Sequence, residues 1–359
     1  MFFVHKYITK SGFFQLFLTQ KSFFKTQKPL KKLLQEIFYI MNISIIGCGR
    51  WGSFLAWYCT KIGHTVTNYG RADSPSFVKL KTTGQNEWIK LDQKIKLSCD
   101  LKSTIESADI VLVSIGCQNF RSFLKQIAPL NFQNKPFVLC MKGIELNSGK
   151  RLSQVAIEEG IDKNNVAVWV GPGHIQEFIN GKPSAMVIDS YCKDLKTKLC
   201  AIFKSPLIRI YEGVDIIGTE IGAAAKNIMG IAAGGLDGSG LTSMKGALIA
   251  RGAREVSRLI KALGGNELSA YGLCHLGDYE ATLFSEHSHN RKFGEMLVKG
   301  ERFEYLAEGI MTAQAMSDLA KKVGVEMPIT NAVCNAIDGL KPEHMIEEMF
   351  KRKTGSEFD

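Results

Sequence analysis

The sequence of 359 residues predicts an α/β domain with a doubly wound sheet, followed by an all-α domain. Three observations support this prediction. Short apolar runs alternate with helical patterns as far as about residue 215. A glycine-rich turn lies between the first of these runs and the first helical pattern. From Gly218 onward, helical patterns follow one another with few strand signals, so we place the two domains at 41–217 and 218–359.

Composition is that of an ordinary globular protein, with 45% hydrophobic and 22% charged residues. The first forty residues hold seven lysines and one acid, Glu36, so +6 of the net charge of +10 lies there. The weakly basic remainder does not predict a nucleic-acid partner, but it suits an anionic substrate. Nine cysteines without a C-x-x-C pair are typical of free thiols in a reducing compartment, so we expect a cytoplasmic protein.

Residues 1–40 form a basic, Phe-rich leader in which no uninterrupted apolar stretch approaches a membrane span. No small-residue cleavage site follows it, and it lacks the arginines of an organelle-targeting segment. Met41 stands directly before the first strand signal. We therefore interpret Met41 as the functional start, or the leader as dispensable, and we expect no stable membrane insertion.

A dinucleotide-binding motif lies in residues 42–71, NISIIGCGRWGSFLAWYCTKIGHTVTNYGR. Gly47, Gly49 and Gly52 form G-x-G-x-x-G after an Ile-rich strand and before a helix and a second strand. In this Rossmann-type context the three glycines permit a tight turn, a close approach of pyrophosphate, and packing of helix on strand. The helix N-terminus then offers free N–H groups to the phosphates. The alternative is a glycine-rich turn with a structural role alone.

The end of the second strand bears on the choice of cofactor. An NAD-preferring site usually places an acid there for the ribose 2′-hydroxyl, whereas this chain has Tyr69, Gly70 and Arg71. The guanidinium of Arg71 can hold a 2′-phosphate bidentately, which slightly favours NADP over NAD. Asp73 lies nearby, and the alternative is that Arg71 is a solvated surface charge.

The remaining elements follow from apolar periodicity. Further strands are predicted within 108–116, 135–146, 167–170, 184–190 and 207–213. Loops after two of these strands, around Lys142 and Gly171, are expected to open onto the cofactor crevice. Helices of the second domain are predicted at 218–236, 245–263, 267–274, 290–299, 304–323 and 330–340. Thr330 is the expected N-cap of the last helix.

Lys226 stands alone among small and apolar residues in the stretch GTEIGAAAKNIMGIAAG, residues 218–234. Its neighbours three and four positions away on a helix are glycine, alanine and methionine, so no ion pair within the helix accounts for its charge. Burying an unpaired ammonium is costly, so either the side chain reaches water or a polar group approaches that face. Spacing alone favours solvent exposure.

Several motifs then occur in one order along the chain. They are GCGRWG at 47–52, KGIE at 142–145, GP at 171–172, AAKNIMGIAAG at 224–234, ALIARG at 247–252, LGD at 276–278, NRKFG at 290–294 and VGVEMPIT at 323–330. In this order the chain resembles the NAD(P)-dependent glycerol-3-phosphate dehydrogenases of bacterial type, from about Met41 to the last predicted helix. The resemblance implies hydride transfer that interconverts sn-glycerol 3-phosphate and dihydroxyacetone phosphate. It also implies a homodimer through the helical half and a role in glycerophospholipid synthesis.

The resemblance assigns roles to individual residues. Lys226 matches the lysine that exchanges a proton with the substrate oxygen, Lys142 one that touches substrate and cofactor, and Asp278 one that binds substrate and helps to fix the catalytic lysine. The further substrate contacts that it implies are Gly171, Gly173, Ser288, His289 and Asn290. The cofactor contacts that it implies are Gly47, Gly49, Arg50, Trp51, Gly52, Arg71, Lys142, Ile175, His289, Leu306 and Glu308.

The residues themselves leave several points open. Burial and Lys142 would lower the pKa of Lys226, while Asp278 would raise it. Asp278 also fits a helix cap, and Glu308 fits a solvated charge on a helix. Four histidines lie on different loops without ligand-like spacing, so we expect no metal site.

Departures from the family pattern concentrate near the substrate. His289 stands where the family has an arginine that clamps phosphate, with Arg291 or Lys292 as candidate substitutes. Gly173 replaces a serine or threonine, and His275 replaces a glycine before LGD. Two alternatives therefore stay open. One is a related dehydrogenase acting on another small phosphorylated or carboxylated alcohol, and the other is an NAD(P)-binding protein with weakened catalysis.

Overall fold

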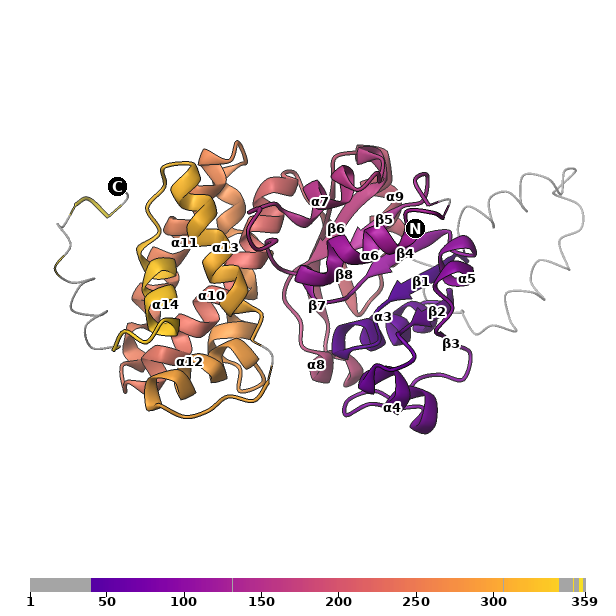
Figure 1. Cartoon of the computed structure of the whole chain (residues 1–359), viewed down its shortest axis with the longest axis horizontal. Helices are drawn as coiled ribbons and strands as arrows, with labels where there is room; N and C mark the ends of the chain where they lie inside the picture. The colour runs from indigo at the N-terminus through magenta and orange to yellow at the C-terminus, as the bar shows by residue number, and fades with distance from the viewer. Residues whose placement is uncertain (1–39, 131, 306, 342–350, 352–354, 358–359) are drawn as a thin grey trace, which may run out of the picture. The chain divides into compact units, whose positions relative to one another are not determined.

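The structure is a computed structural model that describes residues 40–130, 132–305, 307–341, 351 and 355–357. The predicted leader lies outside these residues except for Ile40, so its interpretation stays a prediction. The described chain has a sheet flanked by helices and then a set of helices, which confirms the predicted fold class (Figure 1). No helix in this part of the chain is long and apolar enough to cross a membrane.

Eight strands of the described chain form one sheet in the order β3-β2-β1-β4-β5-β6-β7-β8. They are β1 (Asn42–Ile46), β2 (Thr65–Tyr69), β3 (Lys96–Ser98), β4 (Ile110–Val113), β5 (Phe137–Leu139), β6 (Val166–Val170), β7 (Ser184–Ser190) and β8 (Ile208–Glu212). Neighbouring strands run parallel except β6 and β7, which pair antiparallel. The connecting helix α8 (Ile175–Ile179) has only five residues, which is too short to carry the chain back along β6.

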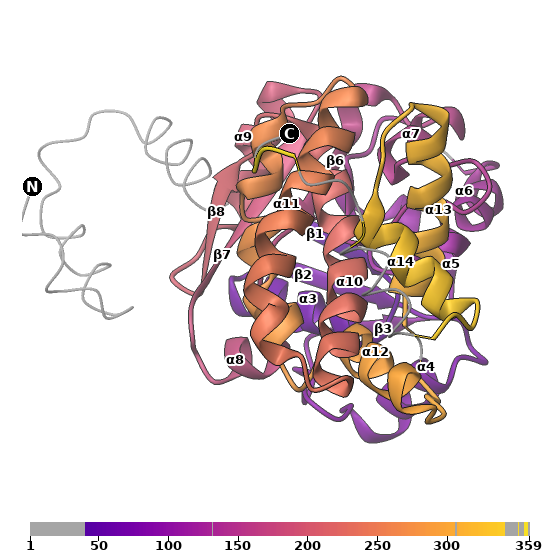
Figure 2. The ribbon, with the colours of Figure 1, turned by 90° about the vertical axis from the view of Figure 1, so that its left-hand side faces the viewer.

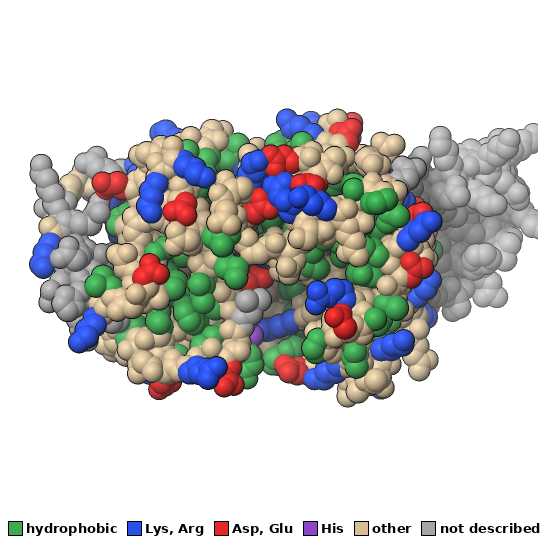
Figure 3. All heavy atoms as spheres, viewed as in Figure 1, with side chains coloured by type: hydrophobic (Ala, Val, Ile, Leu, Met, Phe, Trp, Pro, Cys, Tyr) green, Lys and Arg blue, Asp and Glu red, His purple; other side chains and the backbone are tan. Residues whose placement is uncertain are grey.

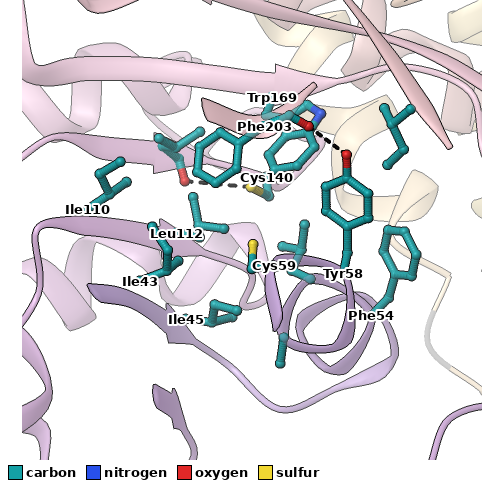
Figure 4. Packing of buried hydrophobic residues seen from close by; sticks show 14 of the residues in the cluster. Ile43, Ile45, Phe54, Tyr58, Cys59, Ile110, Leu112, Cys140, Trp169 and Phe203 are labelled. Atoms are coloured by element: carbon teal, nitrogen blue, oxygen red, sulfur yellow. Dashed lines mark hydrogen bonds between the residues drawn. The ribbon is translucent and has the colours of Figure 1, made fainter. Parts of the chain in front are cut away.

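Helices cover both faces of the sheet, as near-continuous apolar strands require. Those on one face are α3 (Arg50–Lys61), α8 and α9 (Lys193–Phe203). Those on the other are α5 (Leu101–Glu106), α6 (Phe120–Ile127) and α7 (Leu152–Glu158). A further helix, α4 (Pro75–Thr83), follows β2. Figure 4 shows the first of these cores, where the ring of Trp169 stacks on Phe203 and the Tyr58 hydroxyl donates to the Phe203 carbonyl.

The second half is built around α10 (Ile216–Gly238), which lies among the other long helices (Figure 2). These are α11 (Lys245–Ala262), α12 (His289–Lys299), α13 (Gly309–Lys322) and α14 (Pro328–Ile337). Glycines on α10 let its neighbours approach closely. A Cβ on Gly234 would lie 1.8 Å from the Arg291 carbonyl oxygen, and one on Gly230 would lie 2.8 Å from a Thr282 methyl. The small residues around Lys226 therefore make room for other segments of the protein.

Two predicted helices differ from the structure. The helix expected at 304–323 begins only at Gly309, because the Gly309 N–H donates to the Asn290 side chain at 3.0 Å instead of to a helical carbonyl. The helix expected at 267–274 is a 3₁₀ turn at Glu267–Tyr271. The assignment of residues 41–217 and 218–359 to separate domains stays a prediction.

Glu255 of α11 holds the start of α14. Its buried carboxylate accepts hydrogen bonds from the Ile329 N–H at 2.7 Å, the Thr330 N–H at 3.0 Å and the Thr330 hydroxyl at 2.7 Å. The prediction of Thr330 as N-cap is wrong, because the helix already begins at Pro328 and proline is favoured at the first helical position. An acceptor from another helix thus satisfies N–H groups that a cap would otherwise serve.

We expect Glu255→Ala to lower the free energy of unfolding by about 2–4 kcal/mol, because it leaves buried N–H groups without an acceptor. The matched control is Glu267→Ala, which removes an exposed ion pair with Lys261 at 3.1 Å. That change should cost less than about 1 kcal/mol. Urea denaturation followed by circular dichroism measures both variants, and equal losses would contradict the role given to Glu255.

Candidate active site

The turn between β1 and α3 has the geometry of a phosphate-binding loop. Gly47 has a φ of +110°, in the region that favours glycine. A Cβ on Gly52 would lie 2.0 Å from the Gly47 carbonyl oxygen, so α3 packs on the turn only with glycine there. A Cβ on Gly49 would meet no heavy atom within 4 Å, and no side chain caps the helix. The first N–H groups of α3 are therefore open to the pyrophosphate of a dinucleotide.

Residues around this turn leave polar groups for a ligand. The Arg50 guanidinium lies over the Trp88 ring, 5.1 Å from its centroid, and donates to Gln176 Oε1 at 3.1 Å. Trp51 packs against the apolar core of the sheet. The Nε2 atoms of Gln176 and His174 are buried without a hydrogen-bond partner in the described chain. Buried polar atoms of this kind normally have partners, so these residues fit a dinucleotide that supplies hydrogen-bond partners.

The other predicted cofactor contacts have less definite surroundings. Arg71 is 75% exposed and its Nε lies 3.7 Å from Asp73, so the choice between NAD and NADP stays a prediction. Ile175 is buried at the first residue of α8. Leu306 lies outside the described residues. Glu308 is half-buried directly before α13, and burial raises the pKa of its carboxyl against the opposing effect of Lys142 and Lys226.

Two lysines and an aspartate meet in the described chain, each from a different segment. Lys142 follows β5, Lys226 lies on α10, and Asp278 ends the 3₁₀ turn Leu276–Asp278. The Asp278 Oδ2 atom accepts a hydrogen bond from Lys142 Nζ at 2.6 Å and lies 2.9 Å from Lys226 Nζ. The side chains of Asp278 and Lys226 are only 1% and 12% exposed. Figure 3 shows the surface hollowed between sheet and helices, with basic and histidine side chains inside.

The solvent exposure that spacing favoured for Lys226 is wrong. Its Nζ binds Asp278 and also donates to the Thr282 hydroxyl at 2.9 Å, and both partners lie outside its own helix. The Thr282 hydroxyl in turn donates to the Asp278 carbonyl oxygen at 2.8 Å. Sequence reasoning missed Thr282, although a position four residues after Asp278 on a helical segment faces the same side. Asp278 itself caps no helix, because its carboxylate holds the lysines instead.

Lys142 joins the cluster to the edge of the sheet. Its Nζ donates to the Gly171 carbonyl oxygen at 2.9 Å, in addition to its bond with Asp278. Lys142 follows β5 and Gly171 follows β6, and these two strands are parallel neighbours. Ligands of open α/β sheets bind beyond the carboxyl ends of the strands, so the structure brings both predicted residues to the expected edge.

Burial decides the protonation of Lys226. Burial and the smaller effect of Lys142 lower the pKa of the Lys226 ammonium to about 8, against the opposing effect of Asp278. Burial is also the main reason why the pKa of His174 falls, with Lys226 as the next cause. Glu308 interacts electrostatically with both lysines and is partly buried, so it is not the solvated helix charge that the sequence left as an alternative. Both protonation states of Lys226 are thus accessible near neutral pH.

The predicted substrate contacts Ser288, His289 and Asn290 lie at the start of α12. Ser288 caps the helix by accepting a backbone N–H at 3.3 Å, and Asn290 accepts the first N–H of α13 at 3.0 Å. The His289 ring lies 5.5 Å from a tyrosine ring. A Cβ on Gly230 would lie 3.2 Å from the Asn290 Cβ. Since Gly230 is one turn beyond Lys226 on α10, this end of α12 lies close to the lysine cluster.

Arg291, a candidate substitute for the family's arginine, is held by other groups of the described chain. Its Nη1 lies 2.6 Å from Asp237 Oδ2 on α10, and its Nε donates to the Ser285 carbonyl at 3.1 Å. The side chain is 15% exposed. Arg291 therefore braces α12 against α10, whereas the other candidate, Lys292, is exposed.

Phe178 explains the glycine at position 173. A Cβ on Gly173 would lie 2.3 Å from Phe178 Cε2, and that ring is buried and stacked 4.9 Å from Phe54. A serine or threonine would have to displace a packed ring. The missing hydroxyl is thus a consequence of core packing beside the site.

A dinucleotide fold alone is compatible with many activities. The buried Lys226, with a pKa of about 8, favours dehydrogenases among these activities. Hydride transfer at an alcohol carbon needs a group that exchanges the hydroxyl proton. Fold and site together define a dinucleotide-dependent dehydrogenase. No three His, Cys, Asp or Glu side chains of the described chain lie together in a way that could hold a metal ion.

Comparison with known proteins specifies the family. The sequence model of the NAD-dependent glycerol-3-phosphate dehydrogenase N-terminus matches residues 42–196, and that of the C-terminus matches residues 215–347. The chain belongs to this family of NAD(P)-dependent oxidoreductases, which confirms the resemblance noted in its motifs.

Individual relatives agree with this assignment. The glycerol-3-phosphate dehydrogenase [NAD(P)+] of Prosthecochloris aestuarii is 35% identical over 317 residues, covering 84% of this chain and 95% of that enzyme. The enzyme of the same name from Fusobacterium nucleatum is 36% identical over 311 residues, covering 83% of this chain and 92% of that enzyme. The crystal structure of glycerol-3-phosphate dehydrogenase from Coxiella burnetii matches with a TM-score of 0.80 and 27% identity, covering 88% of this chain and 100% of that one.

We expect Gly49→Ala and Gly52→Ala to separate cofactor binding from stability. A methyl group on Gly49 enters the space open to the pyrophosphate, so the Kd for NADPH should rise about tenfold with an unchanged Tm. A methyl group on Gly52 forces α3 away from the turn, so Tm should fall by several degrees. Fluorescence titration and thermal unfolding measure the two effects. A normal Kd for Gly49→Ala would argue against this cofactor site.

Proposed function

We propose that this chain interconverts sn-glycerol 3-phosphate and dihydroxyacetone phosphate, with Lys226 as the proton-exchanging residue and NAD or NADP as cofactor. The observation that carries the proposal is the contact of Lys226 Nζ with Asp278 at 2.9 Å, beside Lys142. Lys142 follows β5, at the same carboxyl edge of the sheet as the turn after β1. The family membership and the printed activity of the relatives support the same reaction. When bound, the nicotinamide gives or accepts the hydride.

Lys226 supplies the proton that the reaction requires. In carbonyl reduction its ammonium donates a proton to the substrate oxygen, and in alcohol oxidation the neutral amine accepts the hydroxyl proton. A pKa of about 8 suits both directions better than the ordinary value of about 10.4. Asp278 orients the Lys226 Nζ through a short contact, and Lys142 keeps positive charge beside the reacting oxygen. Burial of the cluster strengthens each of these interactions.

The start of α12 is the proposed site of the substrate phosphate. Ser288, His289 and Asn290 lie there, on a helix N-terminus that favours negative charge. Gly171 contributes backbone near Lys142, and Gly173 lies two residues further on. With Arg291 held by Asp237, His289 is the basic residue nearest the position of the family's arginine clamp. Phosphate binding is therefore expected to be weaker than with an arginine there.

The cofactor choice and the setting are also proposals. The exposed guanidinium of Arg71, at the end of β2, supports a slight preference for NADP. The nine cysteines are free thiols, which supports a reducing compartment such as the cytoplasm. A homodimer and a role in glycerophospholipid synthesis are proposed from the family resemblance alone.

Oxidation of NADPH by the purified full chain, with dihydroxyacetone phosphate as substrate and NADH in parallel, tests the reaction. Rapid oxidation would support it, and the ratio of the two cofactors would test Arg71. NADPH binding without oxidation would favour the alternatives, which are another small phosphorylated or carboxylated substrate or weakened catalysis. Those alternatives rest on His289, which stands where the family has an arginine.

The pH dependence of kcat/KM should follow the pKa of Lys226, about 8 in the free protein. Reduction needs the ammonium, so its kcat/KM should fall as pH rises through that value. Oxidation needs the neutral amine, so its kcat/KM should rise until pH exceeds that value.

Lys226→Ala should lower kcat by about a thousandfold and leave the Kd for NADPH nearly unchanged. Steady-state rates in both directions check this, and a variant that keeps its turnover would disprove the role.

His289→Arg should lower the KM for dihydroxyacetone phosphate by about threefold to tenfold, because a guanidinium holds phosphate bidentately. Dihydroxyacetone, which has no phosphate, is the control substrate, and its KM should not change. Steady-state kinetics with both compounds measure the effect. An unchanged KM for the phosphorylated compound would mean that another group already binds the phosphate.

A further inference from the structure

His275 is a fully buried histidine that the proposed mechanism does not use. It lies three residues before Asp278, at the start of the same 3₁₀ turn. Both ring nitrogens have partners. Nδ1 lies 2.9 Å from the carbonyl oxygen of Gly222 on α10, and Nε2 lies 2.7 Å from the Tyr279 hydroxyl. A buried imidazole bonded at both nitrogens is held in one orientation.

The partners determine the tautomer of the ring. A carbonyl oxygen only accepts hydrogen bonds, so Nδ1 carries the hydrogen and donates to Gly222. Burial lowers the pKa of His275 to about 4, so near neutral pH the Nε2 atom is unprotonated and accepts from the Tyr279 hydroxyl. The ring therefore stays neutral, and its two hydrogen bonds stay unchanged, over the whole pH range in which Lys226 titrates.

The bond to Gly222 ties the segment that carries Asp278 to the helix that carries Lys226. Gly222 lies one helical turn before Lys226 on α10. A Cβ on Gly222 would lie 2.9 Å from the His275 Cβ, so glycine permits this approach. The His275 carbonyl also accepts the Asp278 N–H at 3.0 Å. One turn further along α10, Asp278 and Thr282 bind the Lys226 ammonium.

The His275–Gly222 hydrogen bond and the Asp278–Lys226 contact respond differently to proton transfer. The contact of Asp278 with Lys226 depends on the positive charge of the lysine, so it weakens when Lys226 becomes neutral. Lys142 then attracts the Asp278 carboxylate without competition, at 2.6 Å. In the part of the chain that the structure describes, His174, Glu308 and His275 itself also interact electrostatically with Lys226. The His275 bond is independent of the lysine charge and opposes such a movement of Asp278.

We propose that His275 is a positioning residue, whose Nδ1–H bond to the Gly222 carbonyl keeps Asp278 against Lys226 in both protonation states of the lysine. This inference rests on the proposed function of Lys226. It predicts that loss of the Nδ1 donor changes the electrostatic surroundings of Lys226 as well as the stability of the fold.

Two variants with similar side chains separate these effects. In His275→Asn the side-chain nitrogen lies near the position of Nδ1 and can donate to Gly222, whereas in His275→Gln the polar atoms lie near the position of Nε2. His275→Asn should keep the apparent pKa of reduction. His275→Gln should lower that pKa by about one unit, because Asp278, which raises the pKa of Lys226, moves away. Its rate of reduction should therefore fall about twofold at pH 7 and about ninefold at pH 9, with an unchanged Kd for NADPH.

The pKa of Lys226 is also measured without turnover, from the pH dependence of its acetylation by acetic anhydride, quantified by peptide mass spectrometry. This reading tests His275 even if dihydroxyacetone phosphate proves to be the wrong substrate, an outcome that counts against the proposed function only. A lower Tm and kcat for His275→Gln with an unshifted pKa would overturn the positioning role, as would equal shifts in both variants. If His275→Gln does not fold, His275→Ala, which also lacks the donor, is compared with His275→Asn by the same measurements.

Discussion

The carboxylate of Asp278 is the interaction on which the rest of the site depends. It is a buried negative charge in contact with two lysine ammonium groups, at 2.6 Å from Lys142 and 2.9 Å from Lys226. Without it, both positive charges would lie together in a region of low dielectric, at a high cost in free energy. Asp278 therefore offsets the repulsion between the two lysines where the loop after β5, helix α10 and the 3₁₀ turn before Tyr279 meet. The glycines of α10 supply the space for that meeting.

The two halves of the chain contribute different parts of the chemistry. The sheet half offers backbone N–H groups and the open turn at Gly49, which suit a dinucleotide and require no titrating side chain. The helical half brings Lys226, and burial among its helices shifts the lysine into a useful range of pKa. Lys142 belongs to the sheet half but binds Asp278 of the helical half. The proposed proton exchange thus depends on a contact between the two halves.

The residues proposed to bind the substrate phosphate differ more from the family pattern than the residues proposed to exchange the proton. The glycine at 173 is explained by the packed ring of Phe178, and Arg291 is engaged with Asp237. Neither feature alters the contacts among Lys142, Lys226 and Asp278. The residues proposed to bind phosphate and those proposed to exchange the proton thus occupy separate contacts, and His289 is the position where this chain departs from the family pattern.

The sequence by itself determined the strand–turn–helix unit at Gly47–Gly52, the extent of α10 and the isolation of Lys226 on it. These features depend on periodicity, glycine sterics and neighbours within a few residues, which are local properties of the chain. Family motifs added Lys142 and Asp278 as partners. Only the tertiary structure decided that Thr282 binds Lys226, that β7 runs antiparallel, and that Glu255 anchors α14. It also decided that burial outweighs Asp278 in setting the pKa of Lys226, because solvent exclusion depends on segments far apart in sequence.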